Sequence, residues 1–491
     1  MVPGMEDDKQ HQLDADAAQL QRLGYAQQLL RDMGGFSNFA VSFSIISILT
    51  GAVTLYGHGL RFGGPFVMTA GWPLVAVMTL TVAASLAQLA SSFPTAGALY
   101  HWSAMLGGPR VGFFTAWLNT IGQFAITAGI DYGLAEFLAD MLGLSRERGH
   151  VLPLYAAILL SHAVLNHVGV RAVALLNNLS AWYHVAGVAV VIGALVAFAP
   201  RQDAAFLLTR FTSESNVYTY GFLIGLLQAQ WTFTGYDASA HVSEETMDPT
   251  RNAPWGIFLS VAVSAVVGYA LLVGVTLAIG NLPTAAAAPN PFLYVLRESL
   301  GPALGGALVW ITIGAMWFCG LSSVTSNSRM LFAFARDGGL PGSAHLARVS
   351  PRFRSPHVAI WVSVVAAFGV AIWSGAYAAM VALSTLALYA SYALPIWVGW
   401  RARRNGTWSR RGPWDLGRFS PLVNGVALGW CAVVMVLFVL PPHQLAGYTF
   451  VGVLALLIVY WQASQRHTFL GPKVTLLAPA QSGRVPGSEI C

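Results

Sequence analysis

Long apolar runs, separated by short polar segments, dominate this sequence. A helix needs about 20 apolar residues to cross the hydrocarbon core of a bilayer. Only 9% of the residues are charged, against about 25% in a typical soluble domain. We therefore expect an all-α polytopic membrane protein with twelve transmembrane helices, at 36–57, 66–90, 112–140, 151–170, 172–199, 217–241, 254–281, 303–334, 356–374, 377–400, 421–440 and 446–463.

The predicted spans divide the chain into a tail at 1–35, a helical domain at 36–464 and a second tail at 465–491. The first tail lacks the basic-then-apolar layout of a cleavable signal. Cytoplasmic loops of membrane proteins carry an excess of Lys and Arg, so both termini are predicted in the cytoplasm, in a plasma membrane. The net charge of +6 is spread over many loops and gives no support for nucleic-acid binding. The largest basic cluster is Arg401, Arg403, Arg404, Arg410, Arg411 and Arg418.

Two of the predicted spans are interrupted at their centres. Thr50 and Gly51 interrupt the first span, and Gly235, within FTGYD, interrupts the sixth. A broken helix at membrane depth is tolerated only where protein or a water-filled cavity surrounds it. A single glycine would indicate only close packing between helices. Here, however, the two interrupted spans are the first spans of two matching halves, 36–199 and 217–400, and 421–463 lies outside both halves. This pairing is typical of inverted-repeat transporters with a binding site near the midplane.

An unwound turn frees amide N–H groups at the start of one half-helix and carbonyl groups at the end of the other. The amide end suits a carboxylate and the carbonyls suit an ammonium group. Thr50 and Gly51 would supply amides and a hydroxyl, and 231–234 would supply carbonyls. The predicted site for a zwitterion comprises Ile48, Leu49, Thr50, Gly51, Gln123, Trp231, Phe233, Thr234, Gly235 and Tyr236.

Ionisable groups inside a span are costly and indicate function. Asp237 is expected to act in gating or to respond to pH, the alternatives being contact with a cationic substrate or capping of the second half-helix. Asp131 lies two turns from Gln123 and would steer an amine inward or pair with a polar neighbour. His162 and His167 have no nearby acid or cysteine that would complete a metal site. They are expected to be core histidines.

The charged loop EETMDPTRNAP, at 244–254, looks like a catalytic cluster, yet its place after the sixth span favours a salt-bridge network at an inner gate. The sequence indicates no catalytic group, metal or cofactor, and its three cysteines are scattered. A polytopic enzyme would need a nucleophile and base or metal ligands, and a channel a continuous polar stripe. An enzyme or a sensor is kept as the alternative from a different class.

Five long segments resemble one group, the amino acid/polyamine/organocation transporters, and within it the amino acid/choline permease branch. The resemblance implies a LeuT-like five-plus-five inverted repeat with discontinuous helices 1 and 6, two further helices, and transport by alternating access as a symporter or antiporter. It implies no cofactor. The segments are SSFPTAGALYHW (91–102), WLNTIGQFAITAGIDYGLA (117–135), NNLSAWYHVAG (177–187), FTGYDASAHVSEETMDPTRNAPWGI (233–257) and SNSRMLFAFARDGGLP (326–341).

The same resemblance implies that the substrate carboxylate binds at Thr50 and Gly51, beneath an aromatic lid formed by Trp231 with Phe233. The chain departs from the family pattern in carrying Asp237 where relatives more often have Glu, and in reading LTG at the first break. Substrates in this branch include neutral amino acids, γ-aminobutyrate, choline and polyamines. We favour a zwitterionic amino acid, with γ-aminobutyrate among the candidates, and the sequence does not indicate the oligomeric state.

Coupling to a proton is favoured over coupling to sodium. His184 aligns with a position where sodium-independent members carry a cation, and an imidazole there would hold the coupled proton. The alternative is a neutral histidine hydrogen-bonded inside the bundle. Hydroxyls that would complete a sodium site in sodium-coupled relatives keep that second option open; they belong to Ser322, Ser323 and Ser326.

Overall fold

The computed structural model describes residues 3–374 and 377–474, and this part of the chain forms helices and no β-strand. A helix satisfies its own backbone hydrogen bonds, as a lipid environment requires. The α-helices are α1 Pro3–Arg22, α2 Gly35–Ile46, α3 Gly51–Thr54, α4 Tyr56–Gly63, α5 Trp72–Ser92, α6 Leu99–Gly107, α7 Pro109–Met141, α8 Arg148–Val168, α9 Val170–Phe198, α10 Tyr218–Gly225, α11 Leu227–Thr232, α12 Ala238–His241, α13 Pro249–Leu277, α14 Leu282–Ala287, α15 Pro291–Arg336, α16 Ser343–Leu346, α17 His357–Ser374, α18 Tyr377–Arg404, α19 Ser420–Leu437, α20 Gln444–Tyr460 and α21 Arg466–Thr468. Shorter helical turns are η1 Val67–Gly71, η2 Ala204–Leu208, η3 Ser243–Glu245, η4 Gly417–Phe419 and η5 Trp461–Gln465.

Nine helical stretches in the described residues are long and apolar enough to cross a membrane. The expected spans at 112–140 and 356–374 correspond to α7 and α17, and the expected span at 217–241 is divided into α10, α11 and α12. The chain is therefore a polytopic membrane protein. The nine stretches are Gly35–Thr54, Val67–Ser92, Arg148–Val168, Val170–Phe198, Pro249–Leu277, Pro291–Arg336, Tyr377–Arg404, Gly417–Leu437 and Gln444–Thr468.

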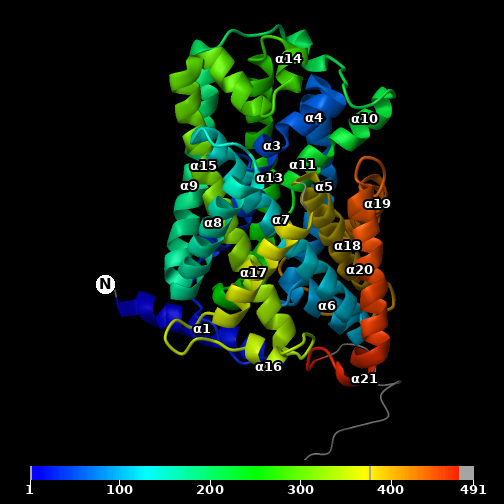
Figure 1. Cartoon of the computed structure of the whole chain (residues 1–491). Coiled ribbons are helices and arrows are strands. Elements are labelled where there is room, and N and C mark those ends of the chain that lie inside the picture. The colour runs from blue at the N-terminus through cyan, green and yellow to red at the C-terminus, as the bar shows by residue number, and fades with distance from the viewer. Residues whose placement is uncertain (1–2, 375–376, 475–491) are drawn as a thin grey trace, which may run out of the picture.

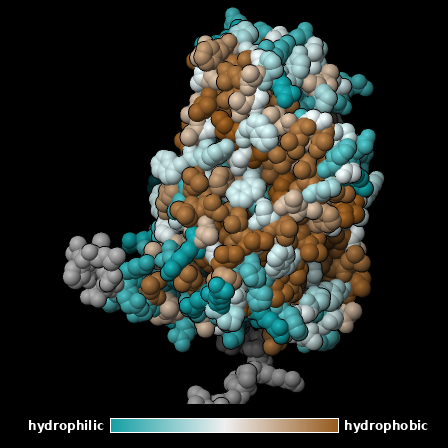
Figure 2. Space-filling model, turned by 60° about the vertical axis from the view of Figure 1, so that its left-hand side comes forward, coloured by the Kyte–Doolittle hydropathy of each residue, from teal (hydrophilic) through white to brown (hydrophobic). Residues whose placement is uncertain are grey.

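The surface of the bundle matches a bilayer. Figure 2 shows hydrophobic residues over the middle of the visible face and hydrophilic residues at both ends. Large apolar side chains such as Leu175, Val266 and Val365 are about 70% exposed on the outside of the bundle. Exposure of this kind is expected where lipid tails replace water as the solvent.

Helices from both halves of the chain pack together at the centre. The helix α7 contacts α15 and α18, and α13 contacts α5 and α2. Because each of these contacts joins segments far apart in sequence, the broken first and sixth spans are enclosed on all sides by continuous helices. This arrangement meets the condition under which broken backbone is tolerated at membrane depth.

The described chain begins and ends at the same end of the bundle. In Figure 1, α1, α16 and α21 lie at the lower end, whereas α4, α10 and α14 lie at the upper end. An even number of crossings follows from this placement. Which end faces the cytoplasm stays a prediction from the distribution of basic residues.

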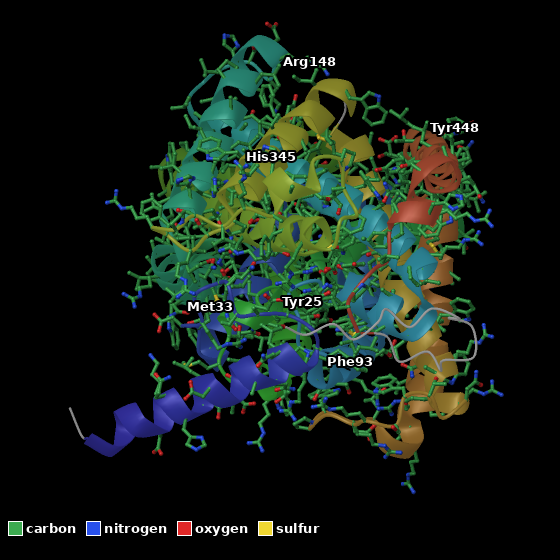
Figure 3. The ribbon with its side chains drawn as sticks, turned by 90° about the horizontal axis from the view of Figure 1, so that it is seen from below. Tyr25, Met33, Phe93, Arg148, His345 and Tyr448 are labelled. Atoms are coloured by element: carbon green, nitrogen blue, oxygen red, sulfur yellow. The ribbon has the colours of Figure 1, made fainter. Side chains whose placement is uncertain are left out.

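The first tail differs from the simple polar extension that the sequence predicts. Residues 23–34 run beneath the lower end of the bundle, where Figure 3 shows Tyr25 and Met33 near its middle. Leu23, Tyr25, Leu29 and Met33 are buried. The Met33 amide donates to the Glu245 carbonyl at 2.9 Å, and the two strands of backbone form an isolated bridge. A few apolar side chains are enough to dock this polar segment against the bundle. They follow no helical or strand periodicity, so the sequence does not predict the docking.

The second tail also begins with a docked segment. Phe469 is buried against an aromatic cluster that includes Tyr100, Phe113 and Phe334. The remainder of this predicted tail, 475–491, with Cys491, lies outside the described residues.

Candidate functional site

The two predicted helix breaks are present and lie side by side. The helix α2 ends at Ile46, and Ser47, with φ 19° and ψ 92°, starts a non-helical stretch that lasts until α3 begins at Gly51. The helix α11 ends at Thr232, and α12 begins after a break centred on Gly235. The sequence places the first break at Thr50 and Gly51, whereas the structure starts it at Ser47. The prediction was based on Gly51, whereas the C-cap of α2 is Ser47, four residues earlier.

Glycine is required at both breaks because the first and sixth spans approach each other too closely there for a side chain to fit. A Cβ on Gly51 would lie 2.5 Å from Thr232 Oγ1 and 2.8 Å from Thr232 Cα. A Cβ on Gly235 would lie 2.3 Å from Ile45 Cγ2, and Gly235 also has φ +87°. Gly235 therefore supplies both a left-handed turn and the space for the first span to touch the sixth.

A small cavity of about 10 Å³ lies where the breaks meet. Its walls are buried, with side chains no more than 5% exposed, so the cavity is closed from both ends of the bundle. It contains no ionisable side chain. The lining residues are Ile45, Ile46, Thr50, Gly51, Ile126, Ile130, Trp231 and Thr232.

Only part of the predicted substrate site lines this cavity. Thr50, Gly51 and Trp231 do, whereas Ile48, Leu49, Gln123, Phe233, Thr234, Gly235 and Tyr236 are not among the lining residues. Phe233 packs against Trp72 with a ring separation of 4.5 Å, which leaves Trp231 as the aromatic group at the cavity. Thr232 falls within the stretch 231–234 that was predicted to supply carbonyls. The four isoleucines were not predicted, because apolar residues in a membrane span carry no signal that distinguishes a cavity wall from a lipid-facing surface.

The backbone groups predicted to hold a zwitterion are partly occupied in this closed arrangement. The amides of Thr50 and Gly51 both donate to the Ser47 carbonyl, at 2.8 and 2.9 Å. The Trp231 carbonyl accepts from the Thr234 amide at 3.1 Å and from its hydroxyl at 2.5 Å. A ligand that uses these groups must displace the local bonds, so binding and rearrangement of the breaks are linked.

Asp237 is the centre of a buried polar cluster. Tyr392 donates to Asp237 Oδ1 at 2.8 Å, and Oδ2 lies 3.2 Å from Asn119 Nδ2, 3.5 Å from Gln123 Nε2 and 3.2 Å from His241 Nε2. Asp237 is the N-cap residue of α12, but its side chain makes no capping hydrogen bond to that helix. Gln123 was predicted to meet substrate but donates to this carboxylate instead.

His184 contacts the first break directly. Its Nδ1 lies 2.8 Å from the Ser180 carbonyl and its Nε2 lies 2.6 Å from Ser47 Oγ, which in turn lies 2.6 Å from Thr50 Oγ1. A carbonyl oxygen can only accept, so Nδ1 carries the proton and the neutral ring accepts at Nε2 from Ser47. The imidazole is thereby tied to the backbone turn that ends α2.

The three serines of the predicted sodium option contact two helices, α9 through Ser322 and α7 through Ser323 and Ser326. Ser322 donates to Asn177 Oδ1 at 2.6 Å, and Ser323 lies 2.7 Å from Thr127 Oγ1. Ser326 accepts from Gln123 at 3.3 Å. Each hydroxyl is engaged with a different partner in the closed arrangement.

Asp131 pairs with a neighbour, which is one of the two alternatives left open by the sequence. Its Oδ2 lies 3.2 Å from His162 Nδ1, and both side chains are fully buried. The sequence did not predict this partner of His162, because helix packing brings together residues that are 31 positions apart. His167 lies elsewhere, 3.3 Å from Trp361 Nε1. In the described residues, His, Cys, Asp and Glu form no group of three that could hold a metal.

The predicted salt-bridge network is present beneath the cavity. Arg336 donates to both carboxylate oxygens of Glu244, at 2.8 and 2.9 Å. Arg329 donates to both oxygens of Glu245 at 3.1 to 3.3 Å, and neither side chain of this pair is exposed. Because the acids follow α12 and the bases end α15, the network joins the sixth span to the eighth.

A second acid extends this network to the first tail. Asp337 Oδ2 accepts from Tyr25 at 2.7 Å and from Tyr100 at 2.8 Å, and lies 3.1 Å from His101 Nε2. The Arg336 guanidinium lies 4.0 Å above the Tyr25 ring. The docked tail, α6 and the end of α15 are therefore held together at one point.

We expect the thermal stability of the purified protein to be constant from about pH 7 to pH 5 and to fall below about pH 4. Burial raises the pKa of Asp337, but hydrogen bonds from His101, Tyr25 and Tyr100 outweigh it and leave the pKa below its ordinary value. A depressed carboxyl pKa stabilises the fold above the unfolded value, and this stability is lost as pH falls through the folded value.

Asp337→Asn should lower the melting temperature at pH 7 and flatten its decline in acid. Glu214→Gln, at an exposed position near the opposite end, serves as the control and should change neither. An unchanged acid profile in Asp337→Asn would contradict the assignment of this pH dependence to Asp337.

Comparisons with known proteins agree with this geometry. A family model described as amino acid permease matches residues 34–461. The chain is similar to the amino-acid permease BAT1 of Arabidopsis thaliana, with 37% identity over 95% of this chain and 98% of that protein. A BAT1 homolog of Oryza sativa subsp. japonica is 38% identical over 94% and 96% of the two chains. A GABA-specific permease of Saccharomyces cerevisiae is 26% identical over 93% and 86%.

Proposed function

The chain belongs to the amino acid permease family and is a membrane transporter rather than an enzyme; from this premise we propose that it is a secondary transporter that moves a neutral amino acid by alternating access. The observation that carries the proposal is the closed cavity at the junction of the two helix breaks. A site that is shut from both ends, at the point where two helices are hinged, is what alternation between two openings requires.

The composition of the cavity favours a zwitterion over a cation. A polyamine carrier would need acidic partners for its unbalanced positive charges, and a quaternary ammonium such as choline is typically held by a cage of aromatic rings, whereas Trp231 is the one aromatic residue among the described residues that line this cavity. Asp131 and Asp237 are both engaged with side chains outside the cavity lining. A neutral amino acid can instead place its two charges on the helix ends at the breaks and its side chain among Ile45, Ile126 and Ile130.

γ-Aminobutyrate is one candidate substrate within this class. One relative is named a GABA-specific permease, at 26% identity. The alternative substrates, choline and polyamines, are outcomes of the transport test below.

Helix contacts support a twelve-span bundle with a five-plus-five repeat. If α2–α9 and α10–α18 are the two halves, a contact made in the first should recur five spans later. The helix α7 packs against α8, α17 and α18, and α15, five spans on, packs against α17, α8 and α9. These are the contacts expected for two related halves, with α19 and α20 as the last two spans.

We place both termini in the cytoplasm and the protein in the plasma membrane. The lower end in Figure 1 carries α1 and α21, and the basic cluster that begins with Arg401, Arg403 and Arg404 ends α18. Loops rich in arginine stay on the cytoplasmic side. The docked first tail then closes the cytoplasmic opening.

His184 is the proposed link between proton coupling and the first break. When neutral, it accepts from Ser47; when protonated, its Nε2 must donate, so Ser47 must turn its hydroxyl away and the turn that ends α2 is altered. We expect His184→Gln to retain substrate exchange and to lose accumulation driven by a proton gradient, because glutamine can bond to Ser47 but cannot titrate. Retained accumulation would leave His184 as a structural histidine.

Uptake into proteoliposomes tests the proposed function. The panel comprises labelled alanine, glutamate, γ-aminobutyrate, choline and putrescine, first in counterflow and then with an imposed proton or sodium gradient. Counterflow of a neutral amino acid is the expected result. Transport of choline or putrescine alone would overturn the substrate assignment, and folded protein that moves none of the five would overturn the proposal.

A further inference from the structure

We propose that His241 and Asp237 together hold the proton that is coupled to transport, as an imidazolium and carboxylate pair that must separate when the proton leaves. The inference rests on the proposed transport function and names the group through which its coupling acts. His241 ends α12, one turn after Asp237, and both side chains are fully buried.

The hydrogen bonds of His241 require two protons on the ring. Its Nδ1 lies 2.9 Å from the Ala96 carbonyl, and its Nε2 lies 3.2 Å from Asp237 Oδ2. A carbonyl oxygen can only accept, so Nδ1 carries a hydrogen. If the ring were neutral, the lone pair of Nε2 would face a carboxylate oxygen. The contact is favourable only if one more proton lies between the two groups.

The contacts of Asp237 place that proton on His241. The Gly235 amide donates to the Tyr392 oxygen at 3.3 Å, which leaves the Tyr392 hydroxyl hydrogen free to donate to Asp237 Oδ1. Asn119 and Gln123 present amide groups to Oδ2. A carboxylate surrounded by donors is in its ionised form, so the imidazole is the protonated partner and the pair is neutral overall.

Among the residues that the structure describes, the groups that face the pair do not supply a charge in place of this proton. From α18, Tyr392 faces Asp237, and α2 faces α12 through the neutral groups of Asn38 and Ser42. On the lower side, the nearest acids are Glu244 and Glu245, each already paired with an arginine, Arg336 and Arg329, of α15. Loss of the proton therefore leaves one uncompensated negative charge in a dry site, which is costly.

The pair connects the cavity to the inner network. Asp237 stands two residues after Gly235, whose neighbourhood forms the sixth-span break. His241 holds the Ala96 carbonyl, and the Ala96 amide donates to Glu244 Oε1 at 3.1 Å. Release of the proton removes the hydrogen bond between Asp237 and His241. The neutral ring keeps its Nδ1 hydrogen for the Ala96 carbonyl, so His241 can move away from Asp237 together with the linker that supports the ion pair of Glu244 and Arg336. Opening toward the lower end then exposes the site to water.

This role is separate from that of His184. In the closed arrangement the bonds of His184 are complete for a neutral ring, since Ser47 can donate to it. The bonds of His241 are complete only for a charged ring. In the closed arrangement the coupled proton therefore lies at the sixth-span break, and His184, which is neutral there, accepts it only when the first break rearranges.

Two substitutions of His241 separate titration from structure. His241→Gln keeps an amide donor for Asp237, and His241→Asn keeps one for the Ala96 carbonyl, but neither group titrates. A gradient of about one pH unit supports about tenfold accumulation if one proton moves with each substrate. In proteoliposomes the wild-type protein should reach this level, and both variants and Asp237→Asn should accumulate none while retaining counterflow. His345→Gln, at an exposed histidine of the lower end (Figure 3), is the matched control.

Retained proton-driven accumulation in His241→Gln and His241→Asn would overturn the inference. Loss of counterflow in all three variants would also overturn it, because the pair would then be needed for binding or folding rather than for coupling. Wild-type protein that exchanges an amino acid but never responds to a pH gradient would overturn the inference and leave the proposed transport function standing. Wild-type protein without counterflow would overturn both.

Discussion

Replacement of Gly235 by alanine should abolish transport and lower the free energy of unfolding by about 2 to 5 kcal/mol. Two costs add together. Gly235 has φ +87°, in the left-handed region, where a residue with a Cβ loses about 1 to 2 kcal/mol. The new Cβ would also lie 2.3 Å from Ile45 Cγ2, and such overpacking costs about 1 to 3 kcal/mol. Thermal unfolding and counterflow of the purified variant measure the two effects.

A control and a rescue identify the cause. Gly193 lies in α9, where an added Cβ would have nothing within 4 Å and φ is not positive, so Gly193→Ala should be neutral or slightly stabilising. Adding Ile45→Ala to Gly235→Ala should recover the packing cost but not the backbone cost. If Gly235→Ala melts and transports like Gly193→Ala, the close approach of the two breaks is not a requirement of the fold.

The features that the sequence predicted well are those with a local signal. Apolar runs of membrane length located the spans, because length and hydropathy are properties of a single segment. The break at Gly235 was predicted for the same reason, since a glycine beside an acid is anomalous within an apolar run. The charged loop after α12 was correctly assigned to salt bridges because four charges in a membrane protein need partners.

The features that the sequence did not predict are those created by packing between distant segments. Nothing local to His241 or Ala96 shows that they meet across a linker and a broken helix. Likewise, nothing local to His162 shows that Asp131, on another helix, lies within hydrogen-bonding distance of its ring. Hydrophobic periodicity predicts which face of a helix is buried, but it does not predict which residue of a neighbouring helix that face contacts.

Removal of Arg329 should be as damaging as the change at Gly235, for a different reason. Arg329→Ala leaves the Glu245 carboxylate buried without its partner, and breaking a buried ion pair in this way costs about 3 to 5 kcal/mol. The Glu245 carbonyl also accepts from the amides of Asp32 and Met33, at 3.1 and 2.9 Å, so displacement of Glu245 would undock the first tail. We expect low yield, a lower melting temperature and protease cleavage near residue 33.

An exposed pair from the same loop provides the control for this prediction. Arg251 lies 3.9 Å from Asp248, with side-chain exposures of 71% and 36%, and such surface pairs contribute at most about 1 kcal/mol. Arg251→Ala should therefore behave like the wild-type protein. Adding Glu245→Gln to Arg329→Met should recover part of the lost stability, because the damage comes from the unpaired charge rather than from the missing contact. If Arg329→Ala is as stable as Arg251→Ala, the inner ion pair does not hold the closed arrangement together, and the docked tail must be retained by its other contacts, such as those of Tyr25 with Asp337 and Arg336.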